Sequence, residues 1–144
     1  MMRRGVRRHD GSAAAQGCMK RIVIDLDGTL TDHRPGVPYA DQPPNPAVVA
    51  RLRDYAEQGF IVAIHTARNM RTHGGNLGLI NALTLPGVIA WLERHGVVYH
   101  EIHVGKPWCG DGGFYVDDKA VRPDEFVRLS PAEIAALVGS DGAP

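Results

Sequence analysis

The stretch IVIDLDGTLTD, residues 22–32, joins a short apolar run to two aspartates and a glycine. Residues 20–25 are rich in β-branched side chains, which is typical of a strand buried on both faces of a parallel sheet. Asp25 and Asp27 follow where this strand ends, and each carboxylate needs water, a partner or a metal. Packing alone is a poor reason for such a pair, so the stretch predicts a functional site.

Outward from this stretch, apolar periodicity and turn residues predict alternating strands and helices. Helices are expected at 45–59, 86–95 and 130–139, further strands at 60–66, 97–105 and 112–118, and a loop with at most one helical turn at 67–83. This alternation predicts an α/β domain of Rossmann-like type, with three α/β/α layers, a mostly parallel sheet and right-handed crossovers.

The chain of 144 residues is long enough for one domain. Residues 1–19 are expected to be a disordered extension, residues 20–139 a single domain, and residues 140–144 a flexible tail. Sixteen basic side chains balance sixteen acidic ones, which argues against nucleic acid as a partner. No apolar run is long enough to cross a membrane. The two cysteines, Cys18 and Cys109, form no CxxC pair, so a reducing cytoplasm is the expected location.

Polar side chains follow all four expected strands. Because the carboxyl ends of parallel strands meet at one edge of a sheet, we expect these side chains to lie close together. They are Asp25 and Asp27, Thr66, Lys106, and Asp117 with Asp118.

Four carboxylates at one edge repel one another, by roughly 4 kcal/mol for a pair about 4 Å apart at an effective dielectric constant near 20. Oxygen ligands and positions left for water and phosphate suit Mg²⁺ better than Ca²⁺. With Mg²⁺ and Lys106 neutralising a phosphate, Asp25 can attack phosphorus and form an acyl phosphate. Asp27 then protonates the leaving oxygen as an acid and later activates water as a base. Gly28 lets the chain turn there, so the Asp27 side chain can reach the leaving group.

The motifs DLDGTLT, HTAR, GKPWCG and YVDD, in this order, resemble those of the haloacid dehalogenase superfamily of phosphatases. The resemblance covers about residues 20–126. It implies that Asp25 is the nucleophile, Asp27 the acid and base, and that Thr66 binds the transferred phosphoryl group. It also implies that Asp25, the backbone carbonyl of Asp27, and Asp117 bind Mg²⁺, with Asp118 in support.

Three longer stretches are similar to small phosphatases of capsule and other surface-polysaccharide biosynthesis: TARNMRTHGGNLGLINALTLPGVIAWL, GKPWCG and FYVDDKAVRPDEF. Only about 17 residues separate Gly28 from Asn45, so the chain resembles the members that have no cap domain. An open site suits either a large substrate or a neighbouring subunit that covers a small one. We therefore expect a homo-oligomer that acts on a sugar phosphate.

Two other functions stay open at this stage. One is a phosphatase for nucleotides or polynucleotide ends, which capless members also include. The other is a non-catalytic partner that binds phosphorylated ligands. Against the second, all of Asp25, Asp27, Lys106 and Asp117 are present.

Other residues near the expected site fit more than one role. Arg68, Arg71 and His73 follow the second strand, where they can bind a phosphate or carboxylate group of the substrate or belong to a solvated loop. A calcium loop starting at Asp25 is excluded because position 30 is leucine instead of glycine. His100 and His103 would point to opposite faces of a strand, which argues against a zinc site.

Overall fold

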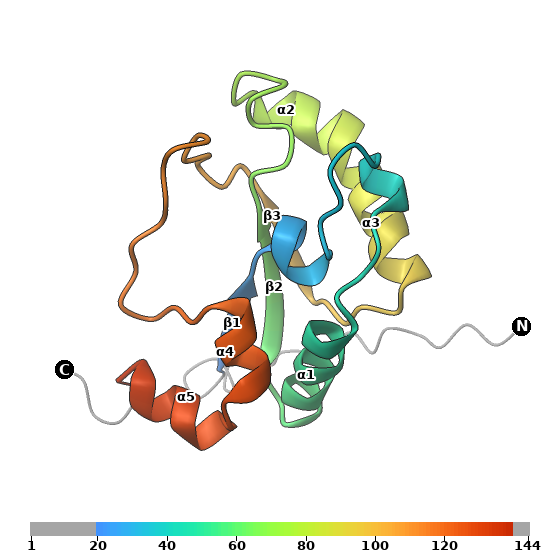
Figure 1. Cartoon of the computed structure of the whole chain (residues 1–144). Coiled ribbons are helices and arrows are strands. Elements are labelled where there is room, and N and C mark those ends of the chain that lie inside the picture. Colours follow the sequence, from blue (N-terminus) through green and yellow to red (C-terminus); the bar gives the residue numbers. More distant parts are fainter. Residues whose placement is uncertain (1–19, 140–144) are drawn as a thin grey trace, which may run out of the picture.

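A computed structural model describes residues 20–139, with a small parallel sheet at the centre (Figure 1). Its strands are β1 (Arg21–Ile24), β2 (Ile61–Thr66) and β3 (Glu101–Val104), in the order β1-β2-β3. The first two confirm the predicted strands, whereas β3 begins later than residue 97. The predictions for residues 1–19 and 140–144 lie outside the described residues.

The first crossover confirms its predicted boundaries. A π-helical turn, η2 (Leu26–Leu30), follows β1, and a short 3-10 turn, η3 (Tyr39–Asp41), precedes helix α1 (Pro46–Glu57). Asn45 caps α1, because its side-chain oxygen accepts a hydrogen bond from the Val48 amide at 3.3 Å. Gly59 ends the segment with a φ of 97°, a conformation that suits glycine.

The second crossover is helical over a longer range than predicted. It consists of α2 (Leu77–Leu79), the π-helical turn η4 (Ile80–Thr84) and α3 (Leu85–Arg94). The expected loop at 67–83 is therefore wrong from residue 77 onward. Asn76 caps the start by accepting from the Leu79 amide at 3.1 Å. Gly78 and Pro86 hid this helix in the sequence, since both disfavour helix interiors.

The chain ends in two short helices, α4 (Pro123–Arg128) and α5 (Pro131–Leu137). Helix α5 confirms the predicted one, and its Ser130 oxygen accepts from the Glu133 amide while the Glu133 carboxylate accepts from the Ser130 amide. Helix α4 was not predicted. Within residues 20–139, no helix has the length and apolar character needed to span a membrane.

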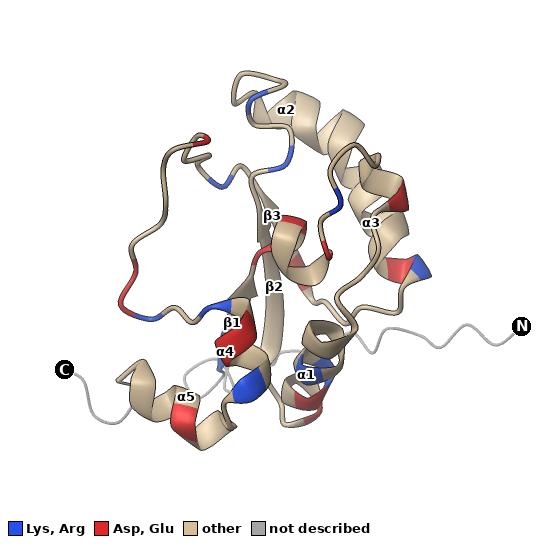
Figure 2. Cartoon of the chain, in the orientation of Figure 1, with Lys and Arg blue, Asp and Glu red and all other residues tan. Residues whose placement is uncertain are grey.

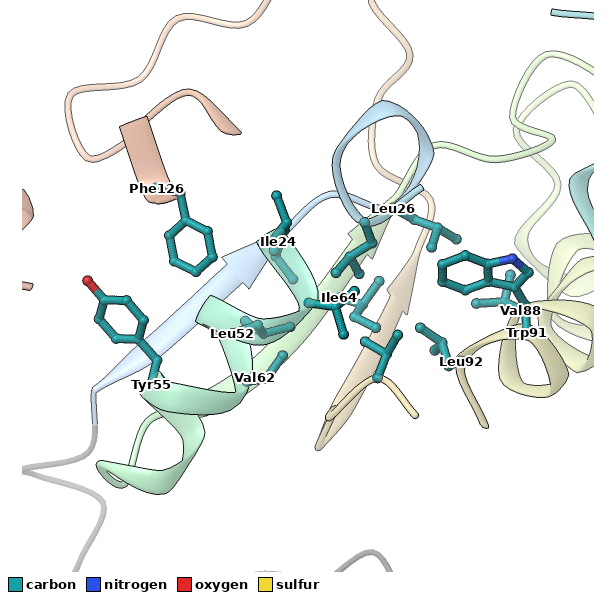
Figure 3. Close-up of a cluster of buried hydrophobic side chains, with 14 residues drawn as sticks. Ile24, Leu26, Leu52, Tyr55, Val62, Ile64, Val88, Trp91, Leu92 and Phe126 are labelled. Atoms are coloured by element: carbon teal, nitrogen blue, oxygen red, sulfur yellow. The ribbon is translucent and has the colours of Figure 1, made fainter. Parts of the chain in front are cut away.

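One apolar core joins the sheet to the helices (Figure 3). Tyr55 of α1 stacks on Phe126 of α4, with ring centroids 5.4 Å apart, so α4 belongs to the core despite its short length. Trp91 of α3 is buried and donates its indole hydrogen to the Gln42 carbonyl at 2.8 Å. Trp91 is therefore a core residue.

The strand order explains why the predicted three layers are not found among the described elements. Because β1, β2 and β3 follow one another in one direction, right-handed crossovers put α1 and α3 on the same face. The opposite face carries Arg21, whose Nε donates to the Glu101 carboxylate at 3.0 Å across β2, and Val23, which is 62% exposed. The fold is α/β, as predicted, but the described part has two layers.

The predicted strand at 112–118 is wrong. Residues 107–120, called the arm below, form a wide loop in Figure 1, and all of them except the half-buried Gly110 are exposed. A crossover between parallel strands takes a dozen or more residues. Only seven residues, 105–111, separate β3 from the expected strand. The local β-forming pattern was correct, but the chain is too short to reach the sheet in that way.

Candidate active site

The turn after β1 places the first two aspartates of the site. Asp25 is still extended, with φ −72° and ψ 157°, and Gly28 then takes a φ of 81°. The Gly28 amide donates to the buried Thr31 hydroxyl at 2.9 Å, which fixes the turn. A glycine is needed here because other residues rarely adopt a positive φ. Asp25 and Asp27 are thus held at the carboxyl end of β1.

Asp25 lies between a cation and a hydroxyl group. Lys106 Nζ is 3.5 Å from one of its carboxylate oxygens, and the Thr29 hydroxyl donates to the other at 3.3 Å. Burial raises the pKa of Asp25 above its ordinary value, while the positive charge of Lys106 partly opposes the shift. The positive charge of Lys106 therefore does not fully offset the cost of burying the ionised carboxylate of Asp25. A bound cation would supply further positive charge.

Asp27 is held by Arg68. The Arg68 Nε and one terminal nitrogen donate to the two Asp27 oxygens at 3.1 and 2.7 Å, in a bidentate pair. The Arg68 side chain is 4% exposed, and its guanidinium lies 4.2 Å from the centre of the Tyr39 ring. We left open whether Arg68 binds substrate or belongs to a solvated loop; in the structure its side chain is buried and its fork is occupied by Asp27. This role was missed, because only the fold brings residues 27 and 68 together.

Thr66 and Lys106 join the second and third strands to the same edge. The Lys106 amide donates to the Thr66 carbonyl at 3.1 Å, directly after the paired residues Thr66 and Val104. The Thr66 hydroxyl oxygen accepts from the Arg68 amide at 3.1 Å and is buried. A hydroxyl that accepts in this way keeps its own hydrogen available as a donor. The structure thus brings Asp25, Lys106 and Thr66 to one edge, as predicted.

Arg71 and His73 lie in the loop after β2, and the structure gives them no bond to the two aspartates. The Arg71 guanidinium lies 5.5 Å from the centre of the Trp108 ring, and the His73 amide donates to the Asn69 carbonyl at 2.9 Å. Their part in substrate binding stays a prediction.

Asp117 and Asp118 are not brought to Asp25 in this conformation. Both are exposed on the arm, and the Asp117 carboxylate accepts a hydrogen bond from the Lys119 amide at 2.8 Å. Figure 2 shows acidic positions after β1 and others on the wide loop. Among residues 20–139, no three acidic, histidine or cysteine side chains are gathered as a metal site. The predicted set of Asp25, Asp27, Asp117 and Asp118 is therefore not assembled within this one copy.

The donor set at β1 nevertheless fits a hard divalent cation in its chemistry. The Asp25 carboxylate and the backbone carbonyl of Asp27 are oxygen donors of the kind Mg²⁺ prefers. The Asp27 carboxylate is engaged by Arg68, so its backbone oxygen is the better candidate.

One residue of the arm reaches this edge and was not expected there. The Tyr115 ring centre lies 4.3 Å from Lys106 Nζ, and the Tyr115 hydroxyl donates to the Pro107 carbonyl at 2.7 Å. Its place as the first residue of the motif YVDD was the only sequence signal.

Comparison with known proteins gives one strong match. No protein-family model matches the chain, and no curated protein matches it significantly. A target protein from Vibrio cholerae with a solved crystal structure is 49% identical, with a TM-score of 0.82 over 86% of this chain and 100% of that chain. At this identity and coverage, the chain belongs to the same family as the Vibrio cholerae protein.

Proposed function

We propose that the protein is a Mg²⁺-dependent phosphomonoesterase that acts through an aspartyl-phosphate. The observation that carries the proposal is the placement of Asp25, with its raised pKa, 3.5 Å from Lys106 at the carboxyl end of the sheet. A partly desolvated carboxylate beside a cation is a suitable nucleophile for a phosphorus centre whose negative charge is neutralised.

In the first step, an Asp25 oxygen attacks phosphorus as the bond to the leaving oxygen breaks. For this step one Asp27 oxygen is released from Arg68 and carries a proton, which it gives to the leaving oxygen as the alcohol departs. Lys106 balances charge on the phosphoryl oxygens, and the Thr66 hydroxyl donates to one of them. Arg68 orients Asp27 through their bidentate pair, so it acts as a positioning residue.

In the second step, water attacks the phosphorus of the acyl phosphate. Asp27, now ionised, takes a proton from this water, and the bond between phosphorus and the Asp25 oxygen breaks. Inorganic phosphate leaves, and both aspartates return to their starting states. Mg²⁺, when bound by Asp25 and the Asp27 carbonyl, would neutralise phosphoryl charge.

The proposed substrate is a sugar phosphate, on the grounds of the resemblance to phosphatases of surface-polysaccharide biosynthesis. The described elements include no cap domain over the carboxyl edge of the sheet. Sixteen basic side chains balance sixteen acidic ones in the sequence, so the overall charge gives no reason to favour nucleic acid.

The test is phosphate release from a panel of sugar phosphates, nucleotides and end-phosphorylated oligonucleotides, with Mg²⁺ and with a chelator. Asp25→Asn removes the nucleophile at nearly constant volume. Asp54→Asn, an exposed position on α1, is the matched control for the loss of one carboxylate.

We expect one sugar phosphate to be hydrolysed best, only with Mg²⁺, by the wild type and Asp54→Asn but not by Asp25→Asn. If the wild type hydrolyses oligonucleotide ends best, the result would contradict the sugar phosphate as substrate and favour a polynucleotide phosphatase. Absence of hydrolysis across the panel would contradict a phosphatase and favour a phosphate-binding partner.

A further inference from the structure

We propose that the arm, residues 107–120, pairs with the open edge of β1 in a second copy of this chain, and that each site is completed in trans. The proposal starts from a strand edge and a segment that both lack a pairing strand among the described residues. β1 pairs with β2 on one side only, and the arm forms no strand. An open strand edge exposes a row of amide and carbonyl groups that is a template for pairing.

The arm contains residues that favour a strand, although it is not paired with the sheet of its own chain. Phe114 is 80% exposed and Val116 is 87% exposed, and in an extended segment residues two apart share a face. Tyr115, between them, contacts Lys106 of its own chain. Aromatic and β-branched residues favour strands. Phe114 and Val116 are therefore left without cover on the side away from their own site.

The length of the chain argues against pairing within one copy. A parallel strand made by residues 114–117 beside β1 would have to start at the amino end of the sheet, whereas the chain leaves β3 at the carboxyl end, and only the nine residues 105–113 lie between them. A dozen or more residues are usual for that return. An antiparallel strand is reachable, but it would carry Asp117 to the amino end of β1, away from Asp25. Only a second copy can receive the arm in parallel without this limit.

The receiving surface and its size also suit a second copy. The face of the sheet next to the open edge carries Val23, which is 62% exposed, although parallel sheets are rarely bare on one face. Aromatic side chains bury about 150–250 Å² each. Two exchanged arms, with the surfaces that receive them, thus bury on the order of 1,000 Å², which reaches the size of a specific interface.

The exchange would place the acidic pair of the arm, Asp117 and Asp118, at the site of the partner. A parallel strand made by the four residues 114–117 matches the four residues of β1 in length. It would bring Asp117 and Asp118 to the carboxyl end of the partner's β1, where Asp25 lies. The exchange itself rests on the geometry of the arm and the edge, whereas the role of Asp117 as a metal ligand rests on the proposed function.

The first test is disulfide trapping in a background in which Cys18 and Cys109 are replaced by serine. Val23→Cys and Val116→Cys proteins are prepared separately, mixed under conditions of subunit exchange and oxidised. We expect a covalent dimer that contains one chain of each kind. A double variant that instead forms only a disulfide within one chain would overturn the proposal.

The second test is sedimentation of the purified full chain. We expect a dimer, and we expect Val116→Asp and Val23→Asp each to weaken it by on the order of tenfold or more, as for residues at the centre of an interface. Leu83→Asp, at a position that is 66% exposed on η4, is the matched control and should leave the dimer intact. A monomeric wild type would overturn the exchange.

The third test separates this proposal from the proposed function. At limiting Mg²⁺, Asp25→Asn and Asp117→Asn are each expected to be inactive alone, but co-refolded in equal amounts they form mixed dimers that have one fully native site. Random pairing then restores about one quarter of wild-type phosphate release. Recovery of no activity from a trapped mixed dimer would overturn completion in trans. An inactive wild type would contradict the phosphatase, while the trapping and sedimentation results would still decide the exchange.

Discussion

The turn after β1 and the arm both carry a pair of acidic residues, but the first is packed into the core and the second is exposed. Leu26 and Leu30 in the turn are fully buried, and Arg68, in the loop after β2, forms an ion pair with Asp27. On the arm, by contrast, Asp117 and Asp118 are exposed. One half of the candidate site is thus built by the local fold, while the other half, in the exchange we propose, is completed on a partner's surface.

The largest expected effect concerns the built half. Asp25→Asn should reduce phosphate release by about 10³-fold or more, because it removes the nucleophile. Asp117→Asn should instead raise the Mg²⁺ concentration needed, and excess Mg²⁺ should recover part of its activity. Steady-state rates over a Mg²⁺ series distinguish the two. Equal losses of activity in both variants, with no recovery at high Mg²⁺, would contradict the distinction between the turn after β1 and the arm.

Leu26→Ala tests how firmly the turn is fixed by packing. Truncating a fully buried leucine typically costs about 2–5 kcal/mol in the free energy of unfolding. We expect a loss in this range by urea denaturation, together with loss of activity because the turn carries Asp25 and Asp27. A loss below 1 kcal/mol, on the scale of a surface change, would show that the turn is less firmly packed.

Arg68→Lys keeps the charge but removes the bidentate fork, so it tests positioning of Asp27. A hydrogen bond to a charged group contributes about 1.5–3 kcal/mol, and we expect a stability loss of this order. The kcat should also fall while KM stays nearly unchanged, because Asp27 acts in the chemical step. Arg53→Lys, at an exposed position on α1, is the control. An unchanged kcat in Arg68→Lys would show that Arg68 does not position Asp27.

The buried position of Asp25 predicts that the stability difference between the wild type and Asp25→Asn depends on pH. Because the pKa of Asp25 is raised in the folded protein, its ionisation opposes folding above that pKa and the penalty is absent below the ordinary value of 3.8. Asp25→Asn should therefore unfold at a higher temperature than the wild type at neutral pH. The difference should vanish as the pH falls below about 3.8. A variant less stable at neutral pH would contradict burial as the dominant cause.

The smallest expected effect concerns the arm. In a monomeric background made by Val23→Asp, Val116→Ala should change the free energy of unfolding by less than about 0.5 kcal/mol, as for an exposed side chain. Urea denaturation of the two proteins, with and without Val116→Ala, measures this. A loss of several kcal/mol would mean that the arm packs on its own chain.

Local pattern was enough to predict the built half. The strand before Asp25, the helix that starts at Asn45 and the strand that ends at Thr66 each depend on short-range preferences, and all are confirmed. The pair of Asp27 and Arg68 could not be predicted, since 41 residues separate its members and only the finished sheet brings them together.

The errors have a different cause. Residues 112–118 have the local preference of a strand, but the decision whether they join a sheet depends on the length of the connection. Gly78 and Pro86 concealed the early helical turns of the second crossover, because tertiary packing of residues such as Ile80 outweighs weak local propensity. Helix α4 was missed because Arg122, at its N-cap, is not one of the usual capping residues.

The sequential strand order has a consequence for biosynthesis. Since neighbours in the chain are also neighbours in the sheet, each crossover can be completed before the next one is synthesised, and the emerging chain need not wait for distant segments. Residues 21–66 already contain a closed βαβ unit with Asp25, Asp27 and Thr66. We expect this unit to become protected during translation, ahead of α4, and assembly between chains to follow only after release from the ribosome.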